Sequence, residues 1–336
     1  MHKFLRQKKL LSKKFVAYSI VSLLALFSFL SLRIGYVNID FFSAIMNGIS
    51  GQKTTDTIIL FELRLPRTLM CLIVGAGLGL AGAALQGYLR NPLAEPSIVG
   101  ISSSAALGAV LCIGLGINTI SFFYTPIFAL SFAMVACLIL IKLTQNTVSR
   151  HSVILIGVGI SALSGSLTTL ILSLSDNPFA INEIVFWMLG SVTDVSYFHV
   201  LLAGPMVLVG SVFLLRCASD LNLLSLGEET ASSTGVNIGR LRLNILFGTA
   251  LIVGGTTSVT GIVGFVGLVT PHMVRPFVNY EPKKTLIWTP PIAALLILVS
   301  DIAIRILPTT GEIKLGVLTA LLGTPFFLYL IGQQRD

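Results

Sequence analysis

The chain has 336 residues, of which 54% are hydrophobic and 11% are charged, and its formal net charge is +8. Soluble domains usually carry about 25% charged residues, and no soluble core of this size could bury so much apolar surface. The composition therefore excludes an ordinary soluble domain and predicts an all-α, polytopic membrane protein. The basic excess does not indicate nucleic-acid binding, because the basic residues lie in short connections between apolar runs.

Ten apolar runs are spaced along the chain, and a spanning helix needs about 20 mostly apolar residues. The first run, 15–35, follows a basic segment over 1–14 and is too long for the apolar part of a signal peptide, so we expect a retained helix. The other nine predicted spans are 66–87, 97–117, 123–143, 152–174, 197–217, 243–261, 262–274, 286–306 and 314–332. We expect a single transmembrane domain over 15–332 and a tail over 333–336.

The weakest boundary separates 243–261 from 262–274, because GIVGFVG gives little to divide two helices. A single span there would reverse the orientation of every later one. Cytoplasmic loops carry the excess of Lys and Arg in membrane proteins. With ten spans and a cytoplasmic N-terminus, the opposite side holds only six of the 22 basic residues, namely Arg33, Lys53, Arg64, Arg67, Arg305 and Lys314. This distribution favours ten spans with both termini in the cytoplasm.

The sequence contains few residues that could bind a metal or nucleotide, couple transport to ions or catalyse a reaction. The cysteines lie singly in or beside apolar runs and are interpreted as core residues without a metal or disulfide role; they are Cys71, Cys112, Cys137 and Cys217. No G-x-x-x-x-G-K-[ST] loop is present, so any ATP must be bound by another polypeptide. Acidic residues lie in connections or near span ends, which weakens an ion-coupled secondary transporter. The spans show no close catalytic set, which disfavours a membrane enzyme.

Small residues are concentrated in the second predicted span. Gly75, Gly79 and Ala83 recur four apart on one helix face, a pattern that lets two helix backbones approach closely in a membrane. Gly77, Gly79 and Gly82 also match a dinucleotide-binding spacing, but no strand precedes them. Close helix packing is the better interpretation.

Two connections carry local signals. The sequence Ser225-Leu226-Gly227-Glu228 fits a capping box, and Gly235 offers a left-handed stop, so a short helix is predicted near 226–235. In the loop 91–96, Pro92 and Pro96 break the helix, and we expect a structural turn there.

Arginines mark the opposite side of the bundle. Arg64 and Arg67 flank Pro66 at the start of the second span, and Arg305 ends the ninth span. Two alternatives to a binding role remain open. Arginine can anchor a helix end among lipid headgroups, and Asp301, one turn before Arg305, could pair with it.

Several stretches resemble the iron-siderophore and cobalamin ABC-importer permease family. The similar segments, in family order, are RLPR at 64–67, GAALQGYLRNPLAEPSIVGISSSAALGAV at 82–110, WMLGS at 187–191, LNLLSLGEETASSTGVNIGRLR at 221–242, GIVGFVGLVTPHMVR at 261–275, SDIAIR at 300–305 and LGVLTALLGTPFFLYLI at 315–331. Ser104 and Lys314 depart from the usual glycine and proline. The segment 36–63 matches little.

The resemblance implies a type II importer permease with ten helices per subunit. It implies a second permease subunit, identical or paralogous, two cytoplasmic ATPase subunits that bind ATP and Mg, and an extracytoplasmic solute-binding protein. The chain would then be a non-enzymatic transport subunit of a bacterial cytoplasmic membrane that binds no cofactor itself. Its expected substrate is an iron-siderophore complex moved by alternating access, with haem or cobalamin as alternatives.

The resemblance also implies roles for particular residues. Arg64, Arg67 and Arg305 match the arginines that meet glutamates of the binding protein. The connection between the sixth and seventh spans matches the coupling helix that contacts the ATPase. Its residues are Ser225, Leu226, Gly227, Glu228, Glu229, Thr230, Ala231 and Gly235.

Overall fold

The computed structural model describes residues 13–145, 150–307 and 313–333, and within these ranges the regular structure is helical, with no strand. This confirms the predicted all-α class. The elements in chain order are α2 (Lys13–Arg33), α3 (Phe41–Ile49), α4 (Thr55–Ile58), η1 (Ile59–Arg64), α5 (Leu65–Leu89), α6 (Ile101–Gly114), η2 (Ile117–Thr119), α7 (Tyr124–Thr144), α8 (Arg150–Ser173), α9 (Pro178–Met188), α10 (Tyr197–Arg216), α11 (Ala218–Leu224), α12 (Glu228–Ser233), α13 (Ile238–Thr260), α14 (Val266–Val274), η3 (Arg275–Val278), α15 (Pro282–Ile306) and α16 (Leu315–Gln333). The tails over 1–12 and 334–336 lie outside the described residues.

Each of the ten predicted spans contains a helix. Seven helices in the described ranges are long and apolar enough to cross a membrane. The prediction of a helix over 262–274 is wrong in its first part. Residues 261–264 are non-helical and Phe265 is a bend, so α14 has only nine residues, about 14 Å at 1.5 Å per residue. The backbone is therefore non-helical over part of its path through the bundle.

Some short α-helices in the described ranges were not predicted, because they are far below the length of a span. They are α3, α4, α9 and α11. α9 nevertheless has ordinary start signals. Asn177 accepts a hydrogen bond from the Phe179 amide at 3.0 Å, and Pro178 takes the first helical position.

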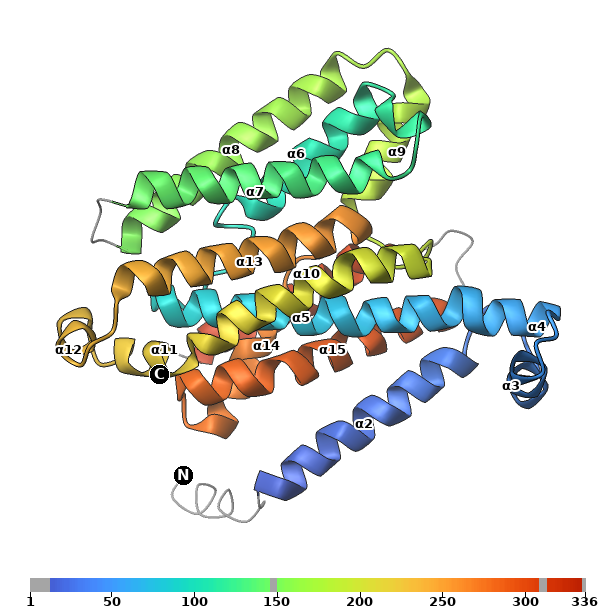
Figure 1. Cartoon of the computed structure of the whole chain (residues 1–336), viewed down its shortest axis with the longest axis horizontal. Helices are drawn as coiled ribbons and strands as arrows, with labels where there is room; N and C mark the ends of the chain where they lie inside the picture. The colour runs from blue at the N-terminus through green and yellow to red at the C-terminus, as the bar shows by residue number, and fades with distance from the viewer. Residues whose placement is uncertain (1–12, 146–149, 308–312, 334–336) are drawn as a thin grey trace.

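Helix α5 is the centre of the bundle and packs against α10, α13, α14 and α15 (Figure 1). A Cβ on Gly75 would lie 2.6 Å from the Ala293 carbonyl oxygen, and one on Gly82 would lie 2.0 Å from the Gly267 carbonyl oxygen. The predicted packing role of this glycine face is confirmed, because no side chain fits where these backbones meet.

The outermost helices contrast with α5. Of the most apolar window in the helical run Thr55–Leu89, 78% is buried, against 6% for α2 and 17% for α8. The apolar surfaces of α2 and α8 must therefore be covered by lipid or by another subunit.

The helical run Thr55–Leu89 is continuous but contains the π-helical segment η1. Pro66 has no backbone N–H to donate to the Glu62 carbonyl, and the Leu65 amide instead bonds the Leu60 carbonyl five residues earlier. This wider turn ends at Arg64, directly before the start of α5, which carries Arg67.

Candidate functional site

The chain carries distinct polar features at opposite ends of the bundle (Figure 1). We call the end where α5 begins and α15 finishes the Asp301 end, and the end that bears α11 and α12 the α12 end. The predicted docking arginines lie at the first, and the predicted coupling segment lies at the second.

Asp301 on α15 joins two of the predicted arginines. Arg67 Nε and Nη2 donate to Asp301 Oδ1 at 2.9 and 2.7 Å, and Arg305 Nη2 donates to Asp301 Oδ2. The Asp301 side chain is 1% exposed. The alternative that Arg305 pairs with Asp301 is thus confirmed. A second partner, Arg67, comes from a helix 234 residues earlier in the sequence.

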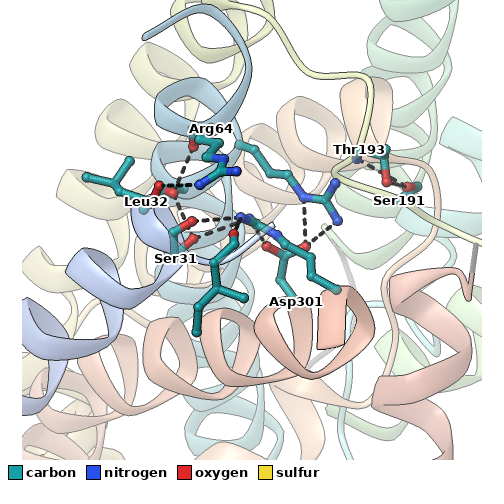
Figure 2. A network of polar contacts seen from close by, with 10 residues as sticks. Ser31, Leu32, Arg64, Ser191, Thr193 and Asp301 are labelled. Atoms are coloured by element: carbon teal, nitrogen blue, oxygen red, sulfur yellow. Dashed lines mark hydrogen bonds and ion pairs between the residues drawn. The ribbon is translucent and has the colours of Figure 1, made fainter. Parts of the chain in front are cut away.

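Other donors of this cluster bind the end of α2. Arg64 Nη1 donates to the carbonyls of Leu32 and Arg33 at 3.0 and 2.7 Å, and Arg64 Nη2 donates to the Val37 carbonyl. Arg305 Nη1 donates to the Ser31 carbonyl at 2.7 Å. The last carbonyls of a helix have no partners inside it, so these guanidinium groups satisfy them. Figure 2 shows Ser31, Leu32, Arg64 and Asp301 within one network.

A pair of hydroxyl groups adds a further contact between α2 and α5. Ser31 Oγ and Thr68 Oγ1 lie 2.8 Å apart in the buried contact between α2 and α5, and Thr68 Oγ1 donates to the Arg64 carbonyl at 2.8 Å. Ser31 was not among the residues singled out from the sequence. A serine near the end of a mostly apolar span was its only signal.

The cluster itself carries an excess of positive charge, because three arginines share the single carboxylate of Asp301. Arg64 and Arg305 are only 5% and 6% exposed, so neither snorkels into the headgroups as a bare anchor. Their contacts explain how α2, α5 and α15 are held together. A role in docking a binding protein stays a prediction.

At the opposite end, α12 extends beyond the first turn of α13 (Figure 1). Gly227, with φ of 123°, precedes α12, and Gly235, with φ of 93°, follows it. The Gly235 amide donates to the Ser232 carbonyl and the Val236 amide to the Ala231 carbonyl, both at 3.0 Å. The predicted short helix and its glycine stop are confirmed.

The predicted capping box is wrong. Ser225 Oγ donates to the Asn222 carbonyl at 2.6 Å, so the serine closes α11, and the N-cap of α12 is Gly227. α12 is fixed to the bundle through Ala231, which is fully buried in the same core as Leu221. Leu226 is 67% exposed and Glu229 is also exposed, so the outward side of this segment remains open to a partner.

The loop 91–96 is a structural turn, as predicted, but it reaches further into the bundle than expected. Glu95 Oε1 accepts a hydrogen bond from the Phe265 amide at 2.7 Å, at the start of α14. Gln86 donates to the Gly267 carbonyl at 3.2 Å and accepts from Arg275 at 2.6 Å. Polar side chains thus form hydrogen bonds with backbone groups of the interrupted span 261–274. A carboxylate between two prolines was the only sequence signal for this contact.

A cavity of about 710 Å³ opens beside the same break. Its lining is almost wholly apolar and comes from the end of α9, the segment 262–265 and α16. The residues that form most of its wall are Leu189, Ile262, Phe265, Gly316, Val317 and Leu321. Non-helical backbone within a membrane occurs where it is buried in protein or lines a cavity, and both conditions are met here.

Among the residues that the structure describes, no group of three or more His, Cys, Asp or Glu side chains could hold a metal ion. The four cysteines are buried and unpaired.

The chain was compared with known proteins. Residues 23–333 match the FecCD transport family. The chain is 35% identical to the hemin transport system permease protein HmuU of Yersinia pestis, over 91% of this chain and 93% of that protein. It is 34% identical to the Fe(3+) dicitrate transport system permease protein FecC of Escherichia coli, over 81% and 82%.

A solved structure agrees with this result. A metal-chelate type ABC transporter in an inward-facing conformation has a TM-score of 0.84 and 31% identity, and the match covers 95% of this chain and 99% of that one. The shared architecture confirms the type II importer permease fold. The chain is an ABC importer permease and belongs to the FecCD transport family.

Proposed function

We propose that this chain is the transmembrane subunit that moves an iron-siderophore complex across a bacterial cytoplasmic membrane by alternating access. Separate ATPase subunits bind ATP and Mg and contact α12, and a second permease subunit completes the pathway. The observation that carries the proposal is the exposed α12 segment, held to the core by Ala231 and bounded by Gly227 and Gly235.

The orientation follows from charge. The connections at the α12 end contain Arg216, Arg240, Lys283 and Lys284, and the positive-inside rule assigns that end to the cytoplasm. The Asp301 end then faces outward, where the net positive charge of the cluster of three arginines and Asp301 would attract and orient an acidic patch on a solute-binding protein. Arg67 is the most exposed of the three arginines, with 11% of its side chain accessible, and is the best placed for direct contact.

The apolar cavity beside 261–265 supports the transport role. It lies where the α13–α14 span is broken, and broken spans in transporters lie near substrate sites. We propose that this surface lines the pathway and moves when α12 is displaced.

The choice of an iron-siderophore rests on the relatives that carry iron chelates. Hemin, cobalamin and molybdate are named as substrates of other relatives and are the competing candidates. The test uses the complete transporter with its cognate binding protein in proteoliposomes. Uptake of a ferric siderophore that excess hemin, cobalamin or molybdate does not reduce supports the proposal. Uptake of one of those three in its place refutes the siderophore assignment and leaves the permease assignment intact.

A further inference from the structure

The helix α3 lies beside the outer end of the α2 helix, in the segment that connects α2 to α4 (Figure 1). It has nine residues, FFSAIMNGI, and none of them is charged. Its side chains divide into three sectors around the helix axis, and each sector has a different environment.

The first sector packs against protein. Ala44 is fully buried, and its carbonyl accepts a hydrogen bond from Thr57 Oγ1 at 3.4 Å. A Cβ on Gly48 would lie 2.5 Å from the Phe61 ring, so α3 is in close contact with η1. Asp40 caps the first turn through the Ser43 amide, and its own amide donates to Asp56 Oδ2 at 3.2 Å. These contacts fix the rotation of α3.

The second sector is apolar and exposed. Phe42, Met46 and Ile49 follow one another at spacings of four and three residues, so they share one helix face. They are 77%, 66% and 79% exposed. The third sector contains the exposed Ser43, and the exposed C-cap residue Ser50 follows on the same side. A helix that presents an apolar face beside a polar one, with protein on its remaining side, is suited to the boundary between lipid and water.

Aromatic contacts connect the apolar sector to the membrane surface of the bundle. The rings of Phe29 and Phe41 lie edge to face with centroids 5.3 Å apart, and Phe41 contacts Phe42 with centroids 6.2 Å apart. Phe29 is on the outer part of α2, the least buried spanning helix, and is itself 44% exposed. The exposed face of α3 is therefore continuous with an apolar surface that lipid can cover.

We propose that α3 lies in the membrane interface at the Asp301 end, with Phe42, Met46 and Ile49 among the acyl chains of that leaflet. Ser43 and Ser50 then face the headgroups and water. α3 would fix the depth of the α2–α5 connection, and with it the level of Arg64 and Arg67, relative to the bilayer. The assignment to a leaflet at this end does not depend on which end faces the cytoplasm.

The test measures the depth of nitroxide labels on the full transporter in nanodiscs of phosphatidylcholine and phosphatidylglycerol. Labels are attached to Met46→Cys and Ile49→Cys in the apolar sector, and to Ser43→Cys as the matched control on the same helix. The unaltered chain, whose four cysteines are buried, gives the background. We expect the Met46 and Ile49 labels to collide more often with oxygen than with a water-soluble nickel chelate, and the Ser43 label to show the reverse.

Equal access of the nickel chelate to the Met46 and Ser43 labels would overturn the proposal. Nickel access at Met46 that is lost only when the solute-binding protein is added would also overturn it, since the face would then be a protein-docking surface. A second measurement avoids cysteine labelling altogether. Phe42→Trp should be quenched by brominated lipid beyond the baseline of the two native tryptophans, and quenching equal to that baseline would contradict the proposal.

Discussion

Polar groups are buried and paired within the chain at one end of the bundle and exposed at the other. At the Asp301 end, three arginines and one aspartate are buried or nearly so; the arginines donate to partners within the chain, and the aspartate accepts from two of them. At the α12 end, a six-residue helix between two glycines with positive φ projects from the bundle and is anchored through Ala231. One end is built from contacts that fix helix positions, and the other offers a surface to a partner.

Because buried and exposed groups respond differently to substitution, the two ends require different assays. Removing one partner of a buried ion pair leaves an uncompensated charge and costs about 3–5 kcal/mol. A substitution at an exposed position usually changes stability by less than about 0.5 kcal/mol. Substitutions at the Asp301 end should therefore affect folding first, and those at the α12 end should affect activity without affecting folding.

The largest effect is expected for Asp301→Asn. The substitution removes the charge that faces both Arg67 and Arg305, and we expect the free energy of unfolding to fall by about 3–5 kcal/mol. Unfolding in a denaturing detergent titration measures the change. Asp194→Asn, at an exposed position, is the control and should be neutral within about 0.5 kcal/mol. Equal stabilities of the two variants would show that the buried cluster does not hold the bundle together.

The next largest loss of stability is expected from a packing substitution in α5, between the two ends of the bundle. Gly82→Ala places a Cβ 2.0 Å from the Gly267 carbonyl oxygen, and we expect a loss of about 1–3 kcal/mol from overpacking. Gly87→Ala on the same helix meets only Leu221 side-chain atoms, the nearest at 3.6 Å, and should be neutral or stabilising by up to about 1 kcal/mol. Thermal unfolding of the two variants gives the comparison, and a Gly82 variant as stable as the Gly87 variant would contradict the close α5–α14 contact.

Arg64→Lys tests whether the hydrogen bonds of the Arg64 guanidinium stabilise the end of α2. Lysine keeps the charge, but its single ammonium group cannot replace a planar guanidinium that bonds the Leu32, Arg33 and Val37 carbonyls. We expect a loss of about 1–2 kcal/mol and faster amide exchange in the last turn of α2. The exposed Arg33→Lys is the matched control. Unchanged exchange in both variants would indicate that the guanidinium contacts do not order the helix end.

The smallest effect on stability is expected at α12. Glu229→Ala changes an exposed side chain and should alter the free energy of unfolding by less than about 0.5 kcal/mol. Under the proposed function it should nevertheless reduce transport-linked ATP hydrolysis, because Glu229 lies on the surface offered to the ATPase. A variant with normal hydrolysis and normal uptake would remove this side chain from the coupling surface.

Much of the fold followed from local patterns. The ten apolar segments, the glycine face of α5 and the stop at Gly235 each depend on residues near in sequence, and the structure contains all of them. The capping box failed because Ser225 has an equally local alternative acceptor, the Asn222 carbonyl. The non-helical part of 261–274 was missed because hydropathy does not distinguish helical from non-helical backbone.

The candidate site was less predictable for a physical reason. Arginine positions were visible, but their partners come from other helices, and no local rule relates Arg67 to Asp301 or Arg64 to the end of α2. The Glu95 contact with Phe265, 170 residues away, is of the same kind. One sequence identifies the charged groups, and only the packed bundle shows which of them are already satisfied.

The most direct test of the central claim is the energy source of uptake. The chain is reconstituted in proteoliposomes with its ATPase subunits and binding protein, and ferric siderophore uptake is measured with ATP or a non-hydrolysable analogue inside and with or without an ionophore. We expect uptake that requires hydrolysable ATP and the ATPase subunits and is insensitive to the ionophore. Uptake by the permease without any ATPase, abolished by the ionophore, would contradict it.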